Sequence, residues 1–538
     1  MQQHIHSHDA VHWYMGELTS RIVAQSGIPT DRHHLGKIIL QGLKDDPDFV
    51  LQIDGGTGRS ETSGSVLKRT IRCATSFRSM GLKRGDVMVL MAPTHLDLAI
   101  PFYAAFYLGI TVAPIDKSLG VHELQTVFEV DRPNIIFCQS EKQQDVQQAL
   151  DHLQLDSKII TFDKGPHGFS FSEMLDHYGN DVKDFKAADF DPNDTLAMLL
   201  SSSGTTGAPK AVAHTHKNFA MMAPYLWSSF TKFPSPVSSV LAVAPLQWLS
   251  TILKFLLSPF IRFTRVQSSQ TLTPDHIYEL INKYRPTYMI ISPTMLTTLL
   301  KPGERDRCDF ACFEMILVGG SAVHNSVLVE VANAYGLSET GCLTFHLAFG
   351  KLGTSGIRYG AFEYKLVNTE QREIFEPNVP GELWLRGPGL FKGYYNNPEA
   401  TADAMTKDGW LKTGDMFYRD ENWNYYFVER LKLLLKYRNH QVSPVEVESV
   451  IIQHPEVQDV AVTGIPHEEF GDLPVACVVR KPGSGVSAQE IKDLVKDKLT
   501  DSKQLRGGVV FMTELPLTPS TKIHRRKLKE MVVSMERE

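Results

Sequence analysis

Cysteine is scarce in this chain of 538 residues, which has six, at positions 73, 138, 308, 312, 342 and 477. So few and so scattered thiols exclude a disulfide framework and favour a reducing compartment. The net charge is −6 and no basic stripe is present, so nucleic acid is not an expected partner. A secretory signal pattern and a C-terminal Ser-Lys-Leu peroxisomal address are also missing. We therefore expect a cytoplasmic protein.

Long uninterrupted hydrophobic runs are missing as well. The longest apolar region, residues 87–114, is broken by Pro93, His95, Asp97 and Pro101, so no transmembrane segment is expected. The chain also lacks a Walker A loop, which disfavours a P-loop NTPase, and a G-x-S-x-G motif, which disfavours a serine hydrolase. Composition is otherwise that of a soluble globular protein, with 42% hydrophobic residues.

A glycine-rich segment is the most informative feature that is present. Residues 201–210 read SSSGTTGAPK and lie between the apolar runs 196–200 and 211–213. Glycine permits positive φ and close approach, so backbone N–H groups in such a turn can converge on an anion, and Lys210 adds a positive charge. The pattern predicts a hairpin loop that binds phosphate. A flexible surface turn is the alternative for this stretch alone.

Short apolar, β-rich runs alternate with helical patterns through most of the chain. The runs 87–91, 135–138, 158–162, 196–200, 288–292 and 315–318 are expected strands, with helices such as 97–108 and 122–130 between them. This alternation predicts the α/β fold class with largely parallel sheets. At 538 residues, two or more domains are expected.

The sequence pattern changes near residue 380, and strands are expected at 380–389 and 424–428. A compact tail follows, with a helix from Pro444, strands 457–462 and 475–479, a helix 488–499 and a strand 509–512. We place the boundary between Glu429 and Arg430. The chain would then have a large N-terminal domain of layered α/β subdomains, residues 1–429, and a small mobile C-terminal α+β domain, residues 430–538.

Five further segments join the glycine-rich loop. They are GGSA at 319–322, YGLSET at 335–340, GWLKTGD at 409–415, ERLK at 429–432 and LPLTPSTKIHRRKL at 515–528. In this order and at these separations the chain resembles the acyl-adenylate-forming superfamily, from about residue 35 to residue 528. The segment FKGYYNNP at 391–398 resembles the branch of 4-coumarate–CoA ligases and luciferases.

The resemblance implies roles for individual residues. Glu339 would bind Mg²⁺, Asp415 would bind the ribose hydroxyls with Arg430 beside it, and Tyr335 would stack on adenine. The other nucleotide-binding residues are expected to be Gly319, Gly320 and Ser321 at the adenine, and Ser202, Ser203, Gly204, Thr205, Thr206, Gly207 and Lys210 at the phosphates. Thr205, Glu339 and Lys522 are the expected catalytic residues.

The tail residues require movement of the small domain. Lys522 would stabilise charge during adenylation only when that domain closes, and the ERLK segment at 429–432 resembles the hinge. After rotation Lys436 would face the active site and could meet the phosphates of coenzyme A. A merely solvated basic loop is the alternative for Lys436 and its neighbours.

One departure from the superfamily pattern concerns the spacing of two motifs. Gly320 and Tyr335 are only 15 positions apart, clearly fewer than in relatives. The missing part is the end of a helix and the strand before Tyr335, and its loss could unseat Tyr335 and Glu339. Either residues 326–333 switch from helix to strand, or nucleotide binding is impaired.

The implied activity is an ATP-dependent acid–thiol ligase with ATP, Mg²⁺ and coenzyme A as cofactors. It would convert a small-molecule carboxylic acid, fatty or aromatic, to an acyl-AMP and then to a thioester. By position the acid pocket should include His216 and residues 245–250. Two alternatives stand beside this reading: a catalytically impaired homologue that acts as a binding or regulatory protein, and a luciferase-like monooxygenase.

Overall fold

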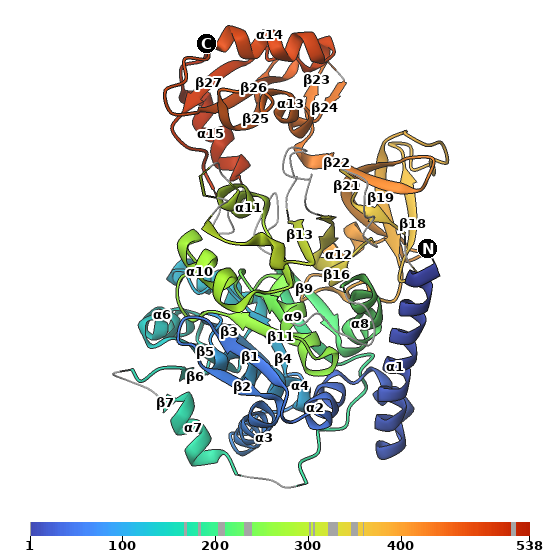
Figure 1. Ribbon diagram of the computed structural model, residues 1–538, viewed down its shortest axis with the longest axis vertical. Coiled ribbons are helices and arrows are strands. Elements are labelled where there is room, and N and C mark those ends of the chain that lie inside the picture. The colour runs from blue at the N-terminus through green and yellow to red at the C-terminus, as the bar shows by residue number, and fades with distance from the viewer. Residues whose placement is uncertain are drawn as a thin grey trace.

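The computed structural model describes most of the chain, and its domains are arranged as Figure 1 shows. The described residues are 2–165, 169–180, 184–202, 210–230, 239–300, 303–304, 307–320, 332–345, 353–358, 360–438, 440–517 and 523–538.

The first sheet has eight strands in the order β20-β9-β8-β4-β3-β5-β6-β7. From β8 to β7 the neighbours pair in parallel, and β9 pairs antiparallel with both β8 and β20. The strands are β3 (Val87–Met91), β4 (Thr111–Pro114), β5 (Ile135–Cys138), β6 (Lys158–Thr161), β7 (Phe169–Ser170), β8 (Leu196–Ser202), β9 (Lys210–Thr215) and β20 (Gly393–Tyr394). Strands β3 to β5 are buried throughout, as unbroken apolar runs predict for a covered parallel sheet.

The second sheet has seven strands in the order β14-β13-β12-β10-β11-β1-β2. All neighbours pair in parallel except β1 and β2. The strands are β1 (Val50–Asp54), β2 (Ser60–Thr62), β10 (Ser239–Leu241), β11 (Thr264–Gln267), β12 (Tyr288–Ile291), β13 (Met315–Gly319) and β14 (Ala332–Ala334). The α/β class with largely parallel sheets, expected from the sequence, is confirmed in these two layers.

Helices cover both sheets. Every residue of α4 is buried, and α4 packs with α2, α3 and α9 in one continuous core. The helices of the large domain are α1 (Gln2–Ser26), α2 (Leu35–Asp45), α3 (Ser63–Ser79), α4 (Ala99–Leu108), α5 (Val121–Asp131), α6 (Gln143–Leu153), α7 (Phe171–Tyr178), α8 (His216–Phe230), α9 (Leu249–Ile261), α10 (Pro274–Tyr284), α11 (Pro293–Leu299) and α12 (Pro398–Ala404). None of the helices described is both long and apolar enough to span a bilayer.

A third sheet completes the large domain. Its five strands are antiparallel in the order β17-β22-β21-β19-β18. They are β17 (Gly356–Ile357), β18 (Glu363–Val367), β19 (Gly381–Arg386), β21 (Leu411–Arg419) and β22 (Asn424–Arg430), and a separate pair is formed by β15 (Gly336–Leu337) and β16 (Cys342–Leu343). The predicted strands near residues 380 and 424 are thus β19 and β22.

The small domain has its own hydrophobic core and lies beyond β22, at the top of Figure 1. Its elements are β23 (Leu435–Tyr437), β24 (His440–Val442), α13 (Pro444–Ile451), β25 (Val457–His467), β26 (Gly471–Arg480), α14 (Ala488–Lys498), β27 (Gly508–Met512) and α15 (Arg525–Ser534). All five expected elements of the tail are present, and β25 is longer than expected because it forms a hairpin with β26. The predicted domain boundary falls at the end of β22.

Local sequence accounts for where the small-domain helices begin. Ser443 accepts a hydrogen bond from the Glu446 N–H and Pro444 occupies the first turn of α13, while Ser487 and Glu490 form a capping box at α14. The two domains meet at β22 and α13, where the Val445 N–H donates to Glu429 Oε2 at 3.4 Å.

The short connection between Gly320 and Tyr335 ends in a strand. Residues 332–334 form β14, which pairs in parallel with β13. The sequence leaves two alternatives for residues 326–333, a switch to strand or impaired nucleotide binding, and the described end of that segment is a strand. Residues 321–331 lie outside the described part of the chain. The backbone of β13 is therefore paired on its β14 side despite the shortening.

Candidate active site

Asp415 is a buried carboxylate with two partners. Its side chain is 2% exposed and accepts a hydrogen bond of 2.6 Å from the Tyr335 hydroxyl at Oδ2. Arg430 Nε lies 3.3 Å from Oδ1. Burial raises the pKa of Asp415, while Arg430 and Tyr335 oppose that shift. The arrangement presents a carboxylate that is oriented from two sides and whose oxygens have further lone pairs to accept hydrogen bonds.

The register of two strands brings Asp415 and Arg430 together. Asp415 on β21 lies directly opposite Arg430 on the antiparallel neighbour β22. The segment of β21 just before Asp415, where the register with β19 shifts, is anchored to β19. The Gly414 N–H donates to Glu382 Oε1 at 2.9 Å, and the Thr413 hydroxyl donates to the Leu383 carbonyl at 2.6 Å. Gly414 has φ of 70°, which glycine adopts without strain.

Tyr335 is held by aromatic rings. Its ring meets Phe417 edge-on at 4.8 Å between centroids and lies 5.9 Å from Phe345 and 6.3 Å from Phe427. Burial and the Asp415 carboxylate raise the pKa of Tyr335, so its hydroxyl stays a donor. Stacking of this ring on adenine stays a prediction.

Gly319 and Gly320 end β13 at the carboxyl edge of the parallel sheet, which is where open α/β sheets bind ligands. Gly319 pairs with Ala334, the residue before Tyr335, so the two predicted adenine-binding motifs are neighbours. A Cβ atom at Gly319 would lie 2.6 Å from the Ala334 carbonyl oxygen. Gly320 has φ of 97°. Both positions therefore require glycine.

Glu339 lies on a short 3₁₀ turn, residues Ser338–Thr340, that is seated against β9. The Ser338 carbonyl contacts His214 Nε2 at 2.7 Å, and the Glu339 carbonyl accepts from the Phe391 N–H at 2.8 Å. The Glu339 side chain accepts a hydrogen bond of 2.8 Å at Oε1 from the Tyr394 hydroxyl. The negative charge of Glu339 contributes to the raised pKa of Asp415, so the two carboxylates are close enough to interact electrostatically.

Lys210 begins β9, directly opposite Ser202 at the end of β8. The glycine-rich segment thus closes a hairpin, as predicted, although the loop residues themselves lie outside the described part of the chain. Lys210 Nζ lies 4.6 Å from the centroid of the Tyr394 ring. Tyr394 therefore contacts both Lys210 and Glu339.

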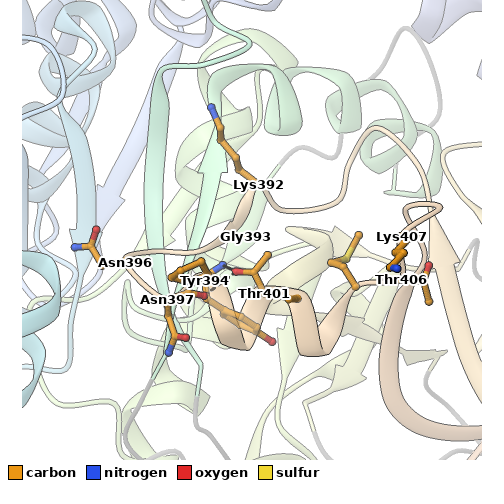
Figure 2. Close-up of a pocket in the computed structure, with 11 residues that line it drawn as sticks. Lys392, Gly393, Tyr394, Asn396, Asn397, Thr401, Thr406 and Lys407 are labelled. Carbon is orange, nitrogen blue, oxygen red and sulfur yellow. Dashed lines mark hydrogen bonds between the residues drawn. The ribbon is translucent and has the colours of Figure 1, made fainter.

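An open cavity of about 670 Å³ lies beside Tyr394, along β20 and α12. Figure 2 shows the Tyr394 ring between Asn397 and Thr401, with Lys392 pointing away. Lys392 forms an ion pair of 2.9 Å with Asp194. The cavity is lined by Tyr394 but not by Glu339 or Lys210.

The residues present fit a magnesium ion that is bound mainly by phosphate. No cluster of three metal-ligating side chains occurs in the described part of the chain. Mg²⁺ needs only one or two protein carboxylates when phosphates and waters supply the other oxygens. Glu339 offers such an oxygen, since Tyr394 bonds to Oε1 and no described residue bonds to Oε2.

Several predicted residues are not placed. Ser203, Gly204, Thr205, Thr206, Gly207, Ser321 and Lys522 lie outside the described residues, as does the side chain of Ser202. Lys436 is described: it is exposed on β23, and its N–H donates to Asp472 within the small domain. Among the described residues, Lys436 makes no hydrogen bond or ion pair with Asp415 or Glu339 in this arrangement of the domains.

One candidate for the acid pocket lies in the core. His216 is fully buried against His34, Phe106 and Phe190, and burial lowers its pKa well below the ordinary value. Two other residues were missed by sequence reasoning, namely Tyr394, which contacts both Lys210 and Glu339, and Glu382, which accepts from the Gly414 N–H on β21. The only sequence signal for them is their place in the conspicuous segments at 391–398 and 380–389.

Comparisons with known proteins identify the family of this chain. The AMP-binding enzyme family matches residues 41–395, and the AMP-binding enzyme C-terminal domain matches residues 446–522. A luciferin 4-monooxygenase of Photuris pensylvanica is 32% identical over 86% of this chain and 88% of its own length. A probable CoA ligase of Humulus lupulus is 30% identical over 90% of each chain. The crystal structure of ATP-bound MatB from Rhodopseudomonas palustris superposes with a TM-score of 0.84 at 22% identity, over 93% of this chain and 99% of the other.

The matched family spans both domains, and the relatives cover the chain almost from end to end. The shared architecture is the α/β fold with a large N-terminal and a small C-terminal domain. The chain therefore belongs to the AMP-binding enzymes of the adenylate-forming superfamily, in the branch of CoA ligases and luciferases.

Proposed function

We propose that this protein is an acid–CoA ligase that activates a carboxylic acid with ATP. The observation that carries the proposal is Asp415, a buried carboxylate oriented by Tyr335 and Arg430 beside the end of the parallel sheet. Such a group is costly to bury, and it is retained where its charge or its acceptors are used.

In the first half-reaction an oxygen of the acid attacks the α-phosphorus of ATP, the bond to the bridging oxygen breaks, and pyrophosphate leaves. Most of the catalysis in such a displacement comes from holding the attacking oxygen in line with the phosphorus and the leaving oxygen, and from stabilising the charge on the phosphates. We assign the ribose to Asp415, the adenine to Tyr335 with Gly319 and Gly320, and the polyphosphate to the glycine-rich loop and Lys210. Mg²⁺ held by Glu339 would neutralise charge on the phosphates.

In the second half-reaction the sulfur of coenzyme A attacks the acyl carbon and AMP leaves. The thioester keeps the acyl group, and the thiol proton passes to solvent or to AMP. Rotation of the small domain about the hinge at residues 429–432 would bring Lys522 to the site in the first step and Lys436 in the second. These two assignments are proposals that follow from the resemblance.

Pyrophosphate exchange tests the first half-reaction directly. With a panel of fatty and aromatic acids, at least one acid should support exchange of labelled pyrophosphate into ATP, and coenzyme A should then yield its thioester. Asp415→Asn should lose exchange by roughly 100-fold or more, because the buried acceptor becomes in part a donor. Asp497→Asn, at an exposed position of α14, is the matched control and should exchange as the wild type does.

Luciferase-like oxygenation is the second candidate, because luciferin 4-monooxygenases are among the relatives at 30–32% identity. Light emission with luciferin and ATP, in the absence of thioester formation with any acid of the panel, would favour it. A catalytically impaired binding protein is favoured if no acid supports exchange while ATP still binds.

A further inference from the structure

Tyr394 touches two of the residues that the proposed function assigns to ATP, yet no step of that function uses it. Its hydroxyl donates a hydrogen bond of 2.8 Å to Glu339 Oε1. The face of its ring lies 4.6 Å from Lys210 Nζ. One side chain therefore contacts both the expected metal-binding carboxylate and the lysine that closes the phosphate loop.

The backbone of Tyr394 is fixed. It pairs with Val212 on β9, and its N–H donates to Thr401 Oγ1 at 2.9 Å, the interaction drawn in Figure 2. Phe391 packs edge-on against the ring, with centroids 5.0 Å apart. A ring that is packed by Phe391 and carried on a fixed backbone can hold its partners in turn.

Each part of the Tyr394 side chain suits the group that it contacts: the hydroxyl donates to the Glu339 carboxylate, and the ring face attracts the Lys210 ammonium. The Glu339 carboxylate can only accept a hydrogen bond when ionised, and the Tyr394 hydroxyl donates one to it. The hydrogen bond occupies one oxygen of Glu339, and Oε2 accepts from no described residue. The ring face attracts the Lys210 ammonium without neutralising it, because a cation–π contact leaves the charge on the lysine.

We propose that Tyr394 is a positioning residue that orients Glu339 for Mg²⁺ and Lys210 for the polyphosphate of ATP. The inference rests on the proposed function of the site. It extends that function by coupling the metal-binding and phosphate-binding residues through one side chain.

Two variants separate the two contacts. Tyr394→Phe keeps the ring under Lys210 and removes the hydroxyl that Glu339 accepts from, whereas Tyr394→Leu removes both. Tyr395→Phe is the matched control, because the Tyr395 side chain packs in a different hydrophobic cluster, on the β3–β5 side. Thermal denaturation of each variant establishes that it is folded.

Calorimetric titrations of ATP at graded Mg²⁺ concentrations measure the Glu339 contact. The Mg²⁺ concentration needed for half of the maximal ATP affinity should rise roughly 10-fold in Tyr394→Phe, as for other residues that orient a metal ligand. It should stay at the wild-type value in Tyr395→Phe. An unchanged Mg²⁺ requirement in folded Tyr394→Phe overturns the inference and leaves the proposed function intact.

Binding of pyrophosphate without Mg²⁺ measures the Lys210 contact. Its affinity should be unchanged in Tyr394→Phe and should fall roughly 2- to 5-fold in Tyr394→Leu, the size of an exposed cation–π contact. Equal affinities in Tyr394→Leu and the wild type overturn this half of the proposal. If the wild type binds no ATP at any Mg²⁺ concentration, the proposed function and the inference both fail.

Discussion

The Tyr335 hydroxyl donates a 2.6 Å hydrogen bond to Asp415 Oδ2, although the two residues are 80 positions apart in the chain. Tyr335 follows β14 of the parallel sheet, and Asp415 lies on β21 of the antiparallel sheet. The bond therefore joins two subdomains at the point where the nucleotide is proposed to bind.

Removing that hydroxyl should change the pH dependence of nucleotide binding. In Tyr335→Phe, Asp415 stays buried but loses a bond that favours its ionised form, so its pKa rises further. An acid with a raised pKa loses its charge sooner as pH falls, so the weakening of AMP binding should begin at a higher pH than in the wild type. AMP titrations between pH 5 and 8 measure this. Tyr418→Phe on the same strand is the control, and a profile identical to the wild type contradicts the assignment.

Glu382 should be needed to hold the segment of β21 just before Asp415. Its two carboxylate oxygens accept from the Gly414 N–H at 2.9 Å and from the Trp384 indole N–H at 2.8 Å. In Glu382→Gln, one of these donors faces an amide NH₂, at a cost of about 1–3 kcal/mol. The AMP dissociation constant should rise roughly 5- to 150-fold, because this cost falls on the segment that positions Asp415.

Glu363→Gln is the control for this variant. Glu363 is an exposed residue of the neighbouring strand β18, and its carboxylate accepts hydrogen bonds from Arg386 on β19. The substitution should therefore leave AMP binding unchanged. Equal AMP affinities in Glu382→Gln and Glu363→Gln would refute a positioning role.

Lys254 should destabilise the large domain at neutral pH. It is 3% exposed on α9, its Nζ donates to the Leu241 carbonyl at 3.1 Å, and burial lowers its pKa to about 7. In the unfolded chain its pKa returns to about 10.4, so between pH 7 and 10 the unfolded state binds a proton that the folded state does not. The free energy of unfolding therefore rises with pH between about 7 and 10. The destabilisation caused by burying the charged amine of Lys254 is fully present below pH 7.

Lys254→Met should accordingly raise the free energy of unfolding at pH 7 by roughly 2–4 kcal/mol, with the gain shrinking toward pH 10. Urea denaturation at pH 7, 8 and 9 measures the difference. Lys44→Met, at an exposed position of α2, should show no such trend. A gain that does not vary with pH would show that the amine is not buried as described.

Arg525 should be essential to the small domain. Its guanidinium forms two bonds to Glu448, of 2.8 and 3.1 Å, and the Glu448 side chain is 3% exposed. In Arg525→Leu the carboxylate loses its buried partner, which should cost about 3–5 kcal/mol. Hydrogen exchange in β25 and β26 should accelerate, whereas Arg526→Leu, whose side chain is 83% exposed, should leave exchange as it is. Unchanged protection in Arg525→Leu would contradict this prediction.

The sequence predicts well those parts of the molecule that depend on local pattern. The alternation of apolar runs predicted the parallel sheets, and the tail elements fell within a few residues of α13, β25, β26, α14 and β27. The pairing of Asp415 with Arg430 needed the resemblance in addition, because antiparallel register decides which residues face one another.

Contacts between distant segments could not be predicted. Tyr394 reaches Glu339 only because β20 pairs with β9, about 180 residues earlier in the chain. The consequence of the shortening before Tyr335 was likewise open, since strand β14 forms by pairing with β13 rather than by a strong local pattern.

Titration of ATP into the protein with Mg²⁺, for the wild type and for Asp415→Asn, tests the central claim most directly. The account predicts one site per chain in the wild type and a loss of affinity of roughly 100-fold in Asp415→Asn. Equal affinity in the two proteins, or no binding by folded wild-type protein, would contradict it.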